Sequence, residues 1–247
     1  MMNREKTAAI STPCTKCTQS LRNQFKTGRI PVIPDIKCKS PGEGDLIAGR
    51  DPAVLAKSLE AAGAAVISVV TEAGHYGGSP ELLYTIARAV SVPILRKDFI
   101  TSREQLLESV GIGASGVLLI ASMLEKKQLF TLIEASLELG LEPLVETHNE
   151  AEIISANEWN LTFLGINNRN IIQWETDDGN VQTTAKLAGL VCQGPFILSE
   201  SAIASPEDVG HAIAAGAHGV LVGTAILKAQ DPIEMYYQLS SIRKPGG

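Results

Sequence analysis

Several short apolar runs of this chain end in side chains that could carry proton-transfer chemistry. A single charge after such a run is usually a solvated loop residue, but here five of eight runs end in lysine, carboxylate or amide groups. Lysines and carboxylates that share one site shift each other's pKa values, which supplies general acids and bases near neutral pH. The candidates at these ends are Asp35, Lys37, Lys97, Glu146, Asn167, Arg169 and Glu200.

The first of these runs carries three charges at alternating positions. Successive side chains of a strand point to opposite faces, so Asp35, Lys37 and Lys39 are expected to share one face. Ile36 and Cys38 then share the other face, under the covering helices. Three charges on one face predict an inward-facing polar site rather than a solvated edge.

The last two apolar runs are followed by small and hydroxyl-bearing residues that suit an anion. Ser201-Ala202 follows one run and Gly223-Thr224 follows the other. Gly223 lets backbone N–H groups approach an anion, and the two hydroxyls can donate hydrogen bonds. In a barrel of parallel strands these two loops form the usual phosphate site. A plain helix cap is the alternative interpretation.

Short apolar strands alternate with amphipathic helices, which predicts parallel strands joined by crossover helices. Eight such units in roughly 210 residues is the count of a (β/α)8 TIM barrel, an α/β fold. A doubly wound sheet is the alternative, but eight regular units favour closure. The predicted strands are residues 31–37, 65–70, 92–97, 116–120, 142–146, 162–167, 196–200 and 218–222.

Capping residues mark the ends of the predicted helices. Thr101 and Glu104 have the spacing of a capping box. A capping side chain precedes a proline at the first helical position in Asp51-Pro52, Ser79-Pro80, Ser205-Pro206 and Asp231-Pro232. Glycines that predict helix ends are Gly63, Gly113, Gly140 and Gly216.

Composition bounds the classes of partner. The 247 residues carry a net charge of −6, from 21 basic and 27 acidic side chains, which argues against a general nucleic-acid binder. A cleft can still be locally basic and bind an anion. No apolar run reaches the ~18 residues of a membrane helix, and the N-terminus lacks a signal-peptide core. We therefore expect no membrane partner, a cytoplasmic protein, and a barrel of residues 31–247 behind a polar extension, residues 1–30.

The cysteines and histidines do not form an obvious site. Cys14 and Cys17 make a lone CxxC pair, and the other two cysteines are isolated, so a second pair of zinc ligands is missing. We interpret the pair as incidental, with a metal or redox role as the alternative. The residues interpreted only as loop or helix-terminal positions are His75, His148, His211 and His218.

Taken together, these segments resemble the indole-3-glycerol-phosphate synthase family. The resemblance extends, in family order and spacing, over about residues 30–241, and is more specific than any single motif. It is carried by Asp35-Ile-Lys-Cys-Lys-Ser-Pro41, Val70-Thr-Glu72 with Gly78-Ser79, Pro93-Ile-Leu-Arg-Lys-Asp-Phe99, Gly116-Val-Leu-Leu-Ile120, Glu142-Pro-Leu-Val-Glu146, Gly165-Ile-Asn-Asn-Arg169, Ser199-Glu-Ser201 and Leu221-Val-Gly-Thr224.

The resemblance implies a carboxy-lyase of tryptophan biosynthesis that uses no metal and no organic cofactor. Its anionic substrate would be 1-(2-carboxyphenylamino)-1-deoxyribulose 5-phosphate, and ring closure, decarboxylation and dehydration would give indole-3-glycerol phosphate. By the same resemblance, Lys97 would be the general acid that protonates the ribulosyl carbonyl, and Glu146 the general base of the dehydration. Lys37 would meet the carboxylate and phosphate side of the substrate. Which lysine serves which proton transfer stays open.

Binding roles follow from the same resemblance. Asn167 and Arg169 would hold the substrate carboxylate, and Glu200 would support the substrate hydroxyls. The phosphate would be surrounded by Ser40, Ser201, Ala202, Gly223 and Thr224, with Leu221 beside them. The apolar pocket for the anthranilate ring would be formed by Tyr76, Phe99, Leu118 and Ile171. Contact with other enzymes of the tryptophan pathway is a further possibility.

Three departures from the family pattern bear on activity. The family has Glu where this chain has Asp35, and retracting a carboxylate by ~1.5 Å can reduce the rate ~100-fold. Ala202 stands at a family glycine position, which strains the loop if its φ is positive. Asn170 stands at a family aspartate position. The alternatives to a working synthase are therefore a divergent paralogue acting on a related anthranilate or sugar phosphate, and a catalytically silent phosphate-binding barrel.

Overall fold

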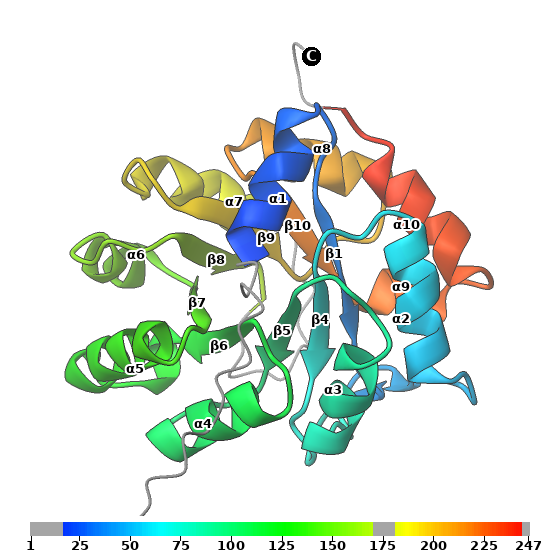
Figure 1. The fold of residues 1–247 in the computed structure, drawn as a ribbon. Helices are drawn as coiled ribbons and strands as arrows, with labels where there is room; N and C mark the ends of the chain where they lie inside the picture. The colour runs from blue at the N-terminus through cyan, green and yellow to red at the C-terminus, as the bar shows by residue number, and fades with distance from the viewer. Residues whose placement is uncertain (1–16, 170–180, 244–247) are drawn as a thin grey trace, which may run out of the picture.

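The computed structural model describes residues 17–169 and 181–243. Its barrel strands are β1 (Val32–Ile36), β4 (Ile67–Val70), β5 (Ile94–Lys97), β6 (Gly116–Ile120), β7 (Glu142–Thr147), β8 (Phe163–Asn167), β9 (Phe196–Glu200) and β10 (Gly219–Val222). All eight are parallel to their neighbours and close in the order β1-β10-β9-β8-β7-β6-β5-β4 (Figure 1). This confirms the predicted TIM barrel. The two remaining strands, β2 (Lys39–Ser40) and β3 (Gly44–Asp45), form a separate antiparallel hairpin after β1.

Helices cover the outside of the barrel. They are α2 (Pro52–Ala61), α3 (Pro80–Ala87), α4 (Arg103–Gly111), α5 (Lys126–Glu138), α6 (Glu150–Ala156), α7 (Gln182–Leu187), α8 (Pro206–Ala214), α9 (Thr224–Lys228) and α10 (Pro232–Ser240), with 3₁₀ turns η1 (Ala121–Met123) and η3 (Ala188–Leu190). Their apolar faces pack on outward-facing strand residues such as Ile36, Val69 and Val117. None of the helices in the described part of the chain has the length and apolar character needed to cross a bilayer.

The helix ends follow the capping residues, with one exception. Side chains cap α2, α3, α8 and α10 at Asp51, Ser79, Ser205 and Asp231, as predicted. For α4 the predicted capping box is displaced by one residue: Ser102, not Thr101, is the N-cap, and Gln105, not Glu104, completes the box. Gln105 takes the last position of the capping box because its amide also donates to the carbonyl of Phe99 at 3.1 Å. A carboxylate could not make this contact. The predicted helix-ending glycines have positive φ at Gly63, Gly113, Gly140 and Gly216.

The N-terminal helix closes one end of the barrel. Figure 1 shows α1 (Cys17–Lys26) lying across the amino-terminal ends of the strands. Cys17 and Leu21 join the apolar cluster inside the barrel, beside residues such as Phe163. The backbone N–H and hydroxyl of Thr18 donate to the buried carboxylate of Glu142 at 3.0 and 2.5 Å. This helix therefore forms the floor of the barrel interior. Cys14, the other half of the CxxC pair, lies outside the described residues.

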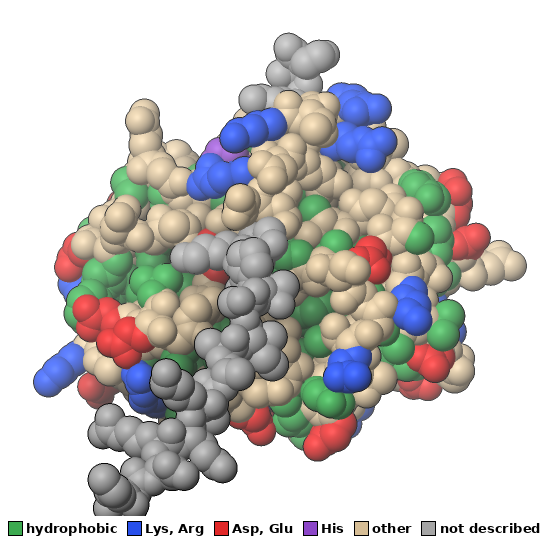
Figure 2. Space-filling view, in the orientation of Figure 1, with side chains coloured by type: hydrophobic (Ala, Val, Ile, Leu, Met, Phe, Trp, Pro, Cys, Tyr) green, Lys and Arg blue, Asp and Glu red, His purple; other side chains and the backbone are tan. Residues whose placement is uncertain are grey.

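The floor end of the molecule carries charges of both signs. Figure 2 shows basic side chains near α1 and a mixture of acidic and basic side chains towards the rim. The two basic residues of α1 are Arg22 and Lys26. The net charge of −6 is therefore an average over an exterior of mixed sign.

Candidate active site

Two adjoining cavities open at the carboxyl-terminal ends of the strands, opposite α1. They share a polar wall made by Asp35, Lys37, Lys97, Arg169 and Ser201. One cavity is completed by the apolar and aromatic residues Val70, Tyr76, Phe99, Leu118 and Ile120, with the polar residues Glu72, Asp98, Glu146 and Asn167 beside them. The other is formed by the loops after β9 and β10 and is lined by Ala202, Leu221, Gly223, Thr224 and Lys228. The charged wall thus separates a compartment suited to a ring from one suited to an anion.

Lys97, the last residue of β5, is the centre of a buried ion-pair cluster. Its Nζ lies 3.0 Å from Oε2 of Glu200 and 3.8 Å from Oε2 of Glu146. Both carboxylates are fully buried, with exposed fractions of 0 and 1%. Burial alone would lower the pKa of Lys97, but the carboxylates of Glu200, Glu146 and Asp35 raise it well above its ordinary value. Lys97 is therefore protonated at neutral pH.

The environments of the two glutamates push their pKa values apart. Burial alone would raise the pKa of Glu146, but contacts with His148 and Lys97 lower it to about 2. Burial raises the pKa of Glu200 to about 7, with Lys97 opposing the increase and the charge of Glu146 adding to it. At neutral pH one carboxylate is ionised and the other titrates. Such a pair is suited to separate acid and base roles.

Glu200 reaches the centre of the barrel because residue 165 has no side chain. A Cβ atom at Gly165 would lie 2.0 Å from Oε1 of Glu200, which is far inside van der Waals contact. The glycine on β8 therefore provides the space in which the glutamate of β9 meets Lys97.

Asp35 is held against the wall of the site by its neighbours. Its Oδ1 accepts a hydrogen bond from the Ser68 hydroxyl at 2.6 Å. On the other side its Oδ2 would lie 3.3 Å from a Cβ atom at Gly223. The short side chain thus fits a narrow space between β4 and β10, while its charge contributes to the raised pKa of Lys97.

The remaining polar residues of the wall come from the ends of β1 and β8. Lys37 is buried, and its Nζ lies 5.6 Å from the centre of the Tyr76 ring. At that range the ring attracts the ammonium group and orients it. The side-chain oxygen of Asn167 accepts the backbone N–H of Arg169 at 3.0 Å, which fixes the turn that brings Arg169 to both cavities.

Two residues of the first predicted motif do not reach the cavities. Alternation along a strand predicts Lys39 beside Asp35 and Lys37, but β1 ends at Ile36 and the chain turns into the β2–β3 hairpin. Lys39 is exposed there and packs its methylenes near Gly77. Ser40, predicted at the phosphate, is buried in the same hairpin and lines neither cavity. The alternation rule fails because it applies only while the chain remains extended. Ile171, predicted for the ring pocket, lies outside the described residues.

The loop after β9 has an unusual backbone. Ser201 and Ala202 both have positive φ, 65° and 56°. A left-handed conformation costs about 1–2 kcal/mol for a residue with a side chain. The strain expected for alanine at a family glycine position is therefore present at Ala202.

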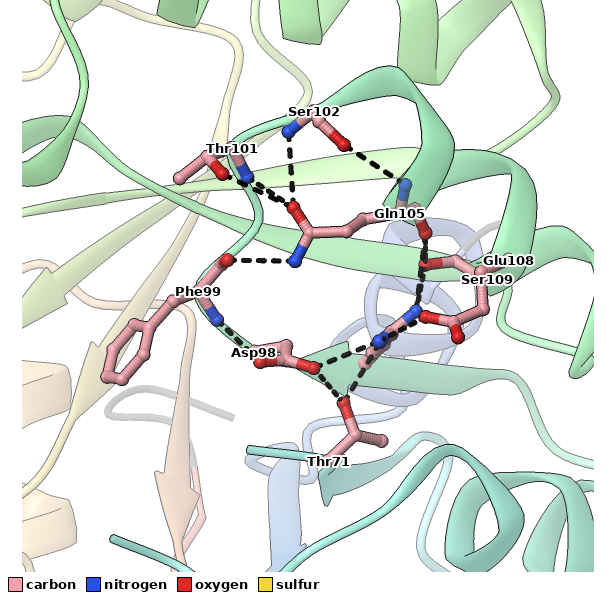
Figure 3. A network of polar contacts seen from close by, with 9 residues as sticks. Thr71, Asp98, Phe99, Thr101, Ser102, Gln105, Glu108 and Ser109 are labelled. Carbon is pink, nitrogen blue, oxygen red and sulfur yellow. Dashed lines mark hydrogen bonds and ion pairs between the residues drawn. The ribbon is translucent and has the colours of Figure 1, made fainter. Parts of the chain in front are cut away.

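Arg96, a buried residue of β5, contacts Thr71, Asp98 and Glu108, which Figure 3 shows close to the loop that carries Phe99. Its Nε donates to the Thr71 hydroxyl at 2.9 Å, and its terminal nitrogens contact Asp98 at 2.9 Å and Glu108 at 2.8 Å. Asp98 in turn accepts the backbone N–H of Phe99 at 2.8 Å. This network joins the ends of β4 and β5 to α4. It therefore holds β5 in place next to Lys97, the residue that follows Arg96.

Replacement of Arg96 by methionine is expected to lower the free energy of unfolding by about 3–5 kcal/mol, because it leaves the partners of a buried cation unpaired. Equilibrium unfolding in urea measures this loss. The matched control is Arg103→Met, which removes an exposed pair with Glu138 and is expected to change the same free energy by less than ~1 kcal/mol. Equal effects of the two substitutions would contradict a structural role for Arg96.

Two site residues were not predicted from the sequence. His148 lies in the loop between β7 and α6, as expected, but its Nε2 lies 3.2 Å from Oε1 of Glu146, a contact that was not predicted. Asn168 is buried behind the site, where its amide donates to the Ser199 hydroxyl at 3.0 Å and its oxygen accepts from Thr184. For His148 the available signal was its position two residues after a strand-end glutamate, which keeps both side chains on one side of the chain.

Comparisons with known proteins agree with this geometry. The family model described as indole-3-glycerol phosphate synthase matches residues 2–239. The indole-3-glycerol phosphate synthase of Pyrococcus furiosus is 42% identical over 211 residues, covering 85% of this chain and 91% of the relative. That of Thermococcus kodakarensis is 41% identical over 217 residues, 88% and 95% of the two chains. That of Halalkalibacterium halodurans is 42% identical over 204 residues, 82% and 78%. The family resemblance of the sequence is thereby confirmed: this chain belongs to the indole-3-glycerol phosphate synthase family.

Proposed function

We propose that this protein converts 1-(2-carboxyphenylamino)-1-deoxyribulose 5-phosphate into indole-3-glycerol phosphate, a step of tryptophan biosynthesis. The observation that carries the proposal is the order of the three parts of the site. An apolar cavity, a wall with Lys97 at its centre, and a loop-lined cavity follow one another. The substrate has an aromatic ring, a reacting carbonyl and a phosphate in the same order. Membership of the family supports the assignment.

Substrate binding in this scheme uses the two cavities separately. The anthranilate ring packs against Tyr76, Phe99 and Leu118. The phosphate binds the loops after β9 and β10, where the contacting residues are Ser201, Ala202, Gly223 and Thr224, above Leu221. Lys37 and Arg169 line both cavities and neutralise the substrate's carboxylate and phosphate. A substrate whose ring is held in one cavity and whose phosphate is held in the other reaches the reactive geometry at a lower entropic cost.

The chemistry begins with carbon–carbon bond formation. The ring carbon that bears the carboxylate attacks the ribulosyl carbonyl carbon, and Lys97 donates a proton to the carbonyl oxygen as the new bond forms. Loss of carbon dioxide returns the bonding electrons to the ring and restores its aromaticity. Loss of water then completes the indole: Glu146 removes a proton from the carbon bonded to the nitrogen, and the hydroxyl formed from the carbonyl takes a proton from a lysine of the wall and leaves as water. No step in this sequence requires a metal or an organic cofactor.

The protonation states of the site match these assignments. Lys97 carries its proton at neutral pH because its pKa is raised, and Glu146 is ionised because its pKa is lowered. Asn167, at the end of β8, helps to lower the pKa of Glu146 by hydrogen bonding. Glu200 titrates near pH 7, so it can both accept from and donate to the substrate hydroxyls. Asp35 adds negative charge that keeps Lys97 protonated.

Turnover of the authentic substrate tests the proposal directly. The purified protein should generate the fluorescence of the indole product, with release of one carbon dioxide per turnover. No turnover above background contradicts the assignment, and binding of the substrate without product would favour a silent phosphate-binding barrel.

We place the reaction in the barrel, residues 31–247, with residues 1–30 as an extension. Because the family is biosynthetic, we also infer a cytoplasmic enzyme. Contact with other tryptophan-pathway enzymes stays a prediction.

Asp35 distinguishes a working synthase from a paralogue with another substrate, which is the second candidate function. If the short side chain merely weakens a synthase, Asp35→Glu is expected to raise kcat severalfold, because one methylene carries the carboxylate ~1.5 Å towards the substrate. Steady-state kinetics with the authentic substrate measure this. An unchanged or lower kcat favours a site adapted to a related anthranilate or sugar phosphate, with Ser68 and Gly223 shaped to the shorter residue.

A further inference from the structure

The carboxylate of Glu146 lies between two cations that approach different oxygens. Its Oε2 faces the ammonium of Lys97 at 3.8 Å, and its Oε1 faces Nε2 of His148 at 3.2 Å. The carboxylate is fully buried, so solvent screens neither interaction. Neither this Oε1 nor Nε2 of His148 has a partner with hydrogen-bond geometry among the described residues, so their contact is an ion pair. The two cations therefore approach this carboxylate from two sides, and Asn167 adds a hydrogen bond.

His148 is itself held by the start of the next helix. Its Nδ1 lies 3.3 Å from Oε2 of Glu152, and its backbone N–H donates to the same oxygen at 2.8 Å. Glu152 is fixed by Asn149, the N-cap of α6: the Asn149 amide donates to Glu152 Oε1 at 2.5 Å, and the Glu152 backbone N–H donates to Asn149 Oδ1 at 3.0 Å. The first turn of α6 thus clamps the imidazole on the side away from Glu146.

The two neighbours of the ring are both carboxylates. A neutral imidazole carries a proton on only one nitrogen, so it could present a donor to only one of them. The imidazolium presents a donor to each. The charged groups facing His148 are Glu146 of β7 and Glu152 of α6, with Lys97 of β5 on the far side of Glu146 and Glu200 of β9 beyond it. Burial alone would lower the pKa of His148, but Glu146 and Glu152 raise it to about 10.

We propose that His148 is a positioning residue for the synthase reaction: an imidazolium, clamped by Glu152, that fixes Oε1 of Glu146 and leaves Oε2 directed towards Lys97 and the substrate. This role rests on the proposed function, because Glu146 acts as a base only if that reaction takes place. Without the imidazolium, the carboxylate is free to close the 3.8 Å separation from Lys97 and pair with it more tightly, which makes Lys97 a weaker acid and Glu146 a weaker base.

Two variants separate the charge of His148 from its clamp, and a third is the control. His148→Gln keeps a donor near Glu146 but removes the charge, and is expected to lower kcat about 10–100-fold, the scale of a small misplacement of a catalytic group, with KM within about twofold. Loss of a cation at this range raises a carboxylate pKa by about 1–3 units, so the activity of this variant falls at pH 5 relative to pH 8 more than that of the unmodified protein. Glu152→Gln leaves the ring but weakens the clamp and shifts the profile in the same direction by less. His211→Gln, at an exposed position of α8, is the matched control with unchanged kinetics and pH profile.

Nuclear magnetic resonance of the resting protein gives a readout that needs no turnover. The imidazole signals of His148, identified by their absence in His148→Gln or by their shift in Glu146→Gln, should remain those of the charged ring from pH 5 to pH 8. In Glu146→Gln the ring should titrate at a lower pH than in the unmodified protein. Titration of His148 near pH 6.5 in the unmodified protein overturns the proposal, as does a His148→Gln variant with full kcat and an unaltered pH profile. If the unmodified protein shows no synthase turnover, the proposed function fails, whereas the titration still establishes or overturns the Glu152–His148–Glu146 arrangement.

Discussion

Replacement of Lys97 by methionine is expected to reduce kcat by about 10³–10⁴-fold, towards the upper end of what general acid catalysis supplies. Methionine has nearly the length of lysine but no proton to give, so the ribulosyl carbonyl would gain its negative charge without protonation. The residue is the one cation in the described structure that contacts both Glu146 and Glu200. Indole fluorescence in a turnover assay measures the loss, and binding of indole-3-glycerol phosphate should survive it.

Folding must be monitored in this variant, because removing one partner of a buried ion pair can cost about 3–5 kcal/mol. The double variant Lys97→Met with Glu200→Gln removes an unpaired carboxylate along with the lysine and should recover part of the stability but none of the turnover. Lys126→Met, which breaks an exposed pair with Glu158, is the control with full activity. A Lys97→Met enzyme that is folded and retains more than a tenth of the normal kcat would remove Lys97 from the role of acid.

The second large effect concerns Glu146. Glu146→Gln keeps the shape of the side chain and removes its basicity, and kcat for indole formation is expected to fall about 10²–10³-fold. If Glu146 is the base of the dehydration, carbon–carbon bond formation and decarboxylation still proceed. Carbon dioxide release in a single turnover should then precede indole fluorescence, whereas in Lys97→Met both signals should be lost. Equal slowing of the two signals in Glu146→Gln would mean that Glu146 acts before decarboxylation.

Glu142 provides a matched control for Glu146. It lies on the same strand, is equally buried, and differs in being at the floor of the barrel, where it accepts hydrogen bonds from Thr18 and Thr162. Glu142→Gln is expected to lower the free energy of unfolding by about 1–3 kcal/mol, because it weakens buried charge-assisted hydrogen bonds, and to leave kcat within twofold. The same substitution should therefore affect stability at Glu142, at the floor end of β7, and catalysis at Glu146, at the site end.

The barrel itself was predictable from the sequence, because its signal is repeated eight times and each repeat is local. Lys97, Glu146, Asn167 and Glu200 were predictable for the same reason: each ends an apolar run, and in a closed parallel barrel all such ends meet on one face. Strand alternation placed Asp35 and Lys37 correctly only as far as the strand remained regular. It failed for Lys39, because the chain turns into the β2–β3 hairpin after β1. Ser40, which the family resemblance placed at the phosphate, lies in the same hairpin and lines neither cavity.

The unpredicted parts of the site depend on contacts between elements. His148 gains its environment from Glu152, which comes close only when α6 begins at the right residue. The path of Glu200 depends on the empty space at Gly165 of a neighbouring strand. Sequence spacing does not report such contacts, because they are set by strand register and helix phase across the barrel.

The contact between Thr18 and Glu142 also bears on how the chain folds. These residues are 124 positions apart, so α1, although near the start of the chain, can make this contact only once β7 is in place. Long-range closures of this kind form late, because loop entropy must be overcome before the contact forms. Cys17 is fully buried only when α1 is in place. The rate at which this thiol becomes protected from an alkylating reagent during refolding should therefore report the closing of the barrel floor, and it should lag behind the recovery of secondary structure.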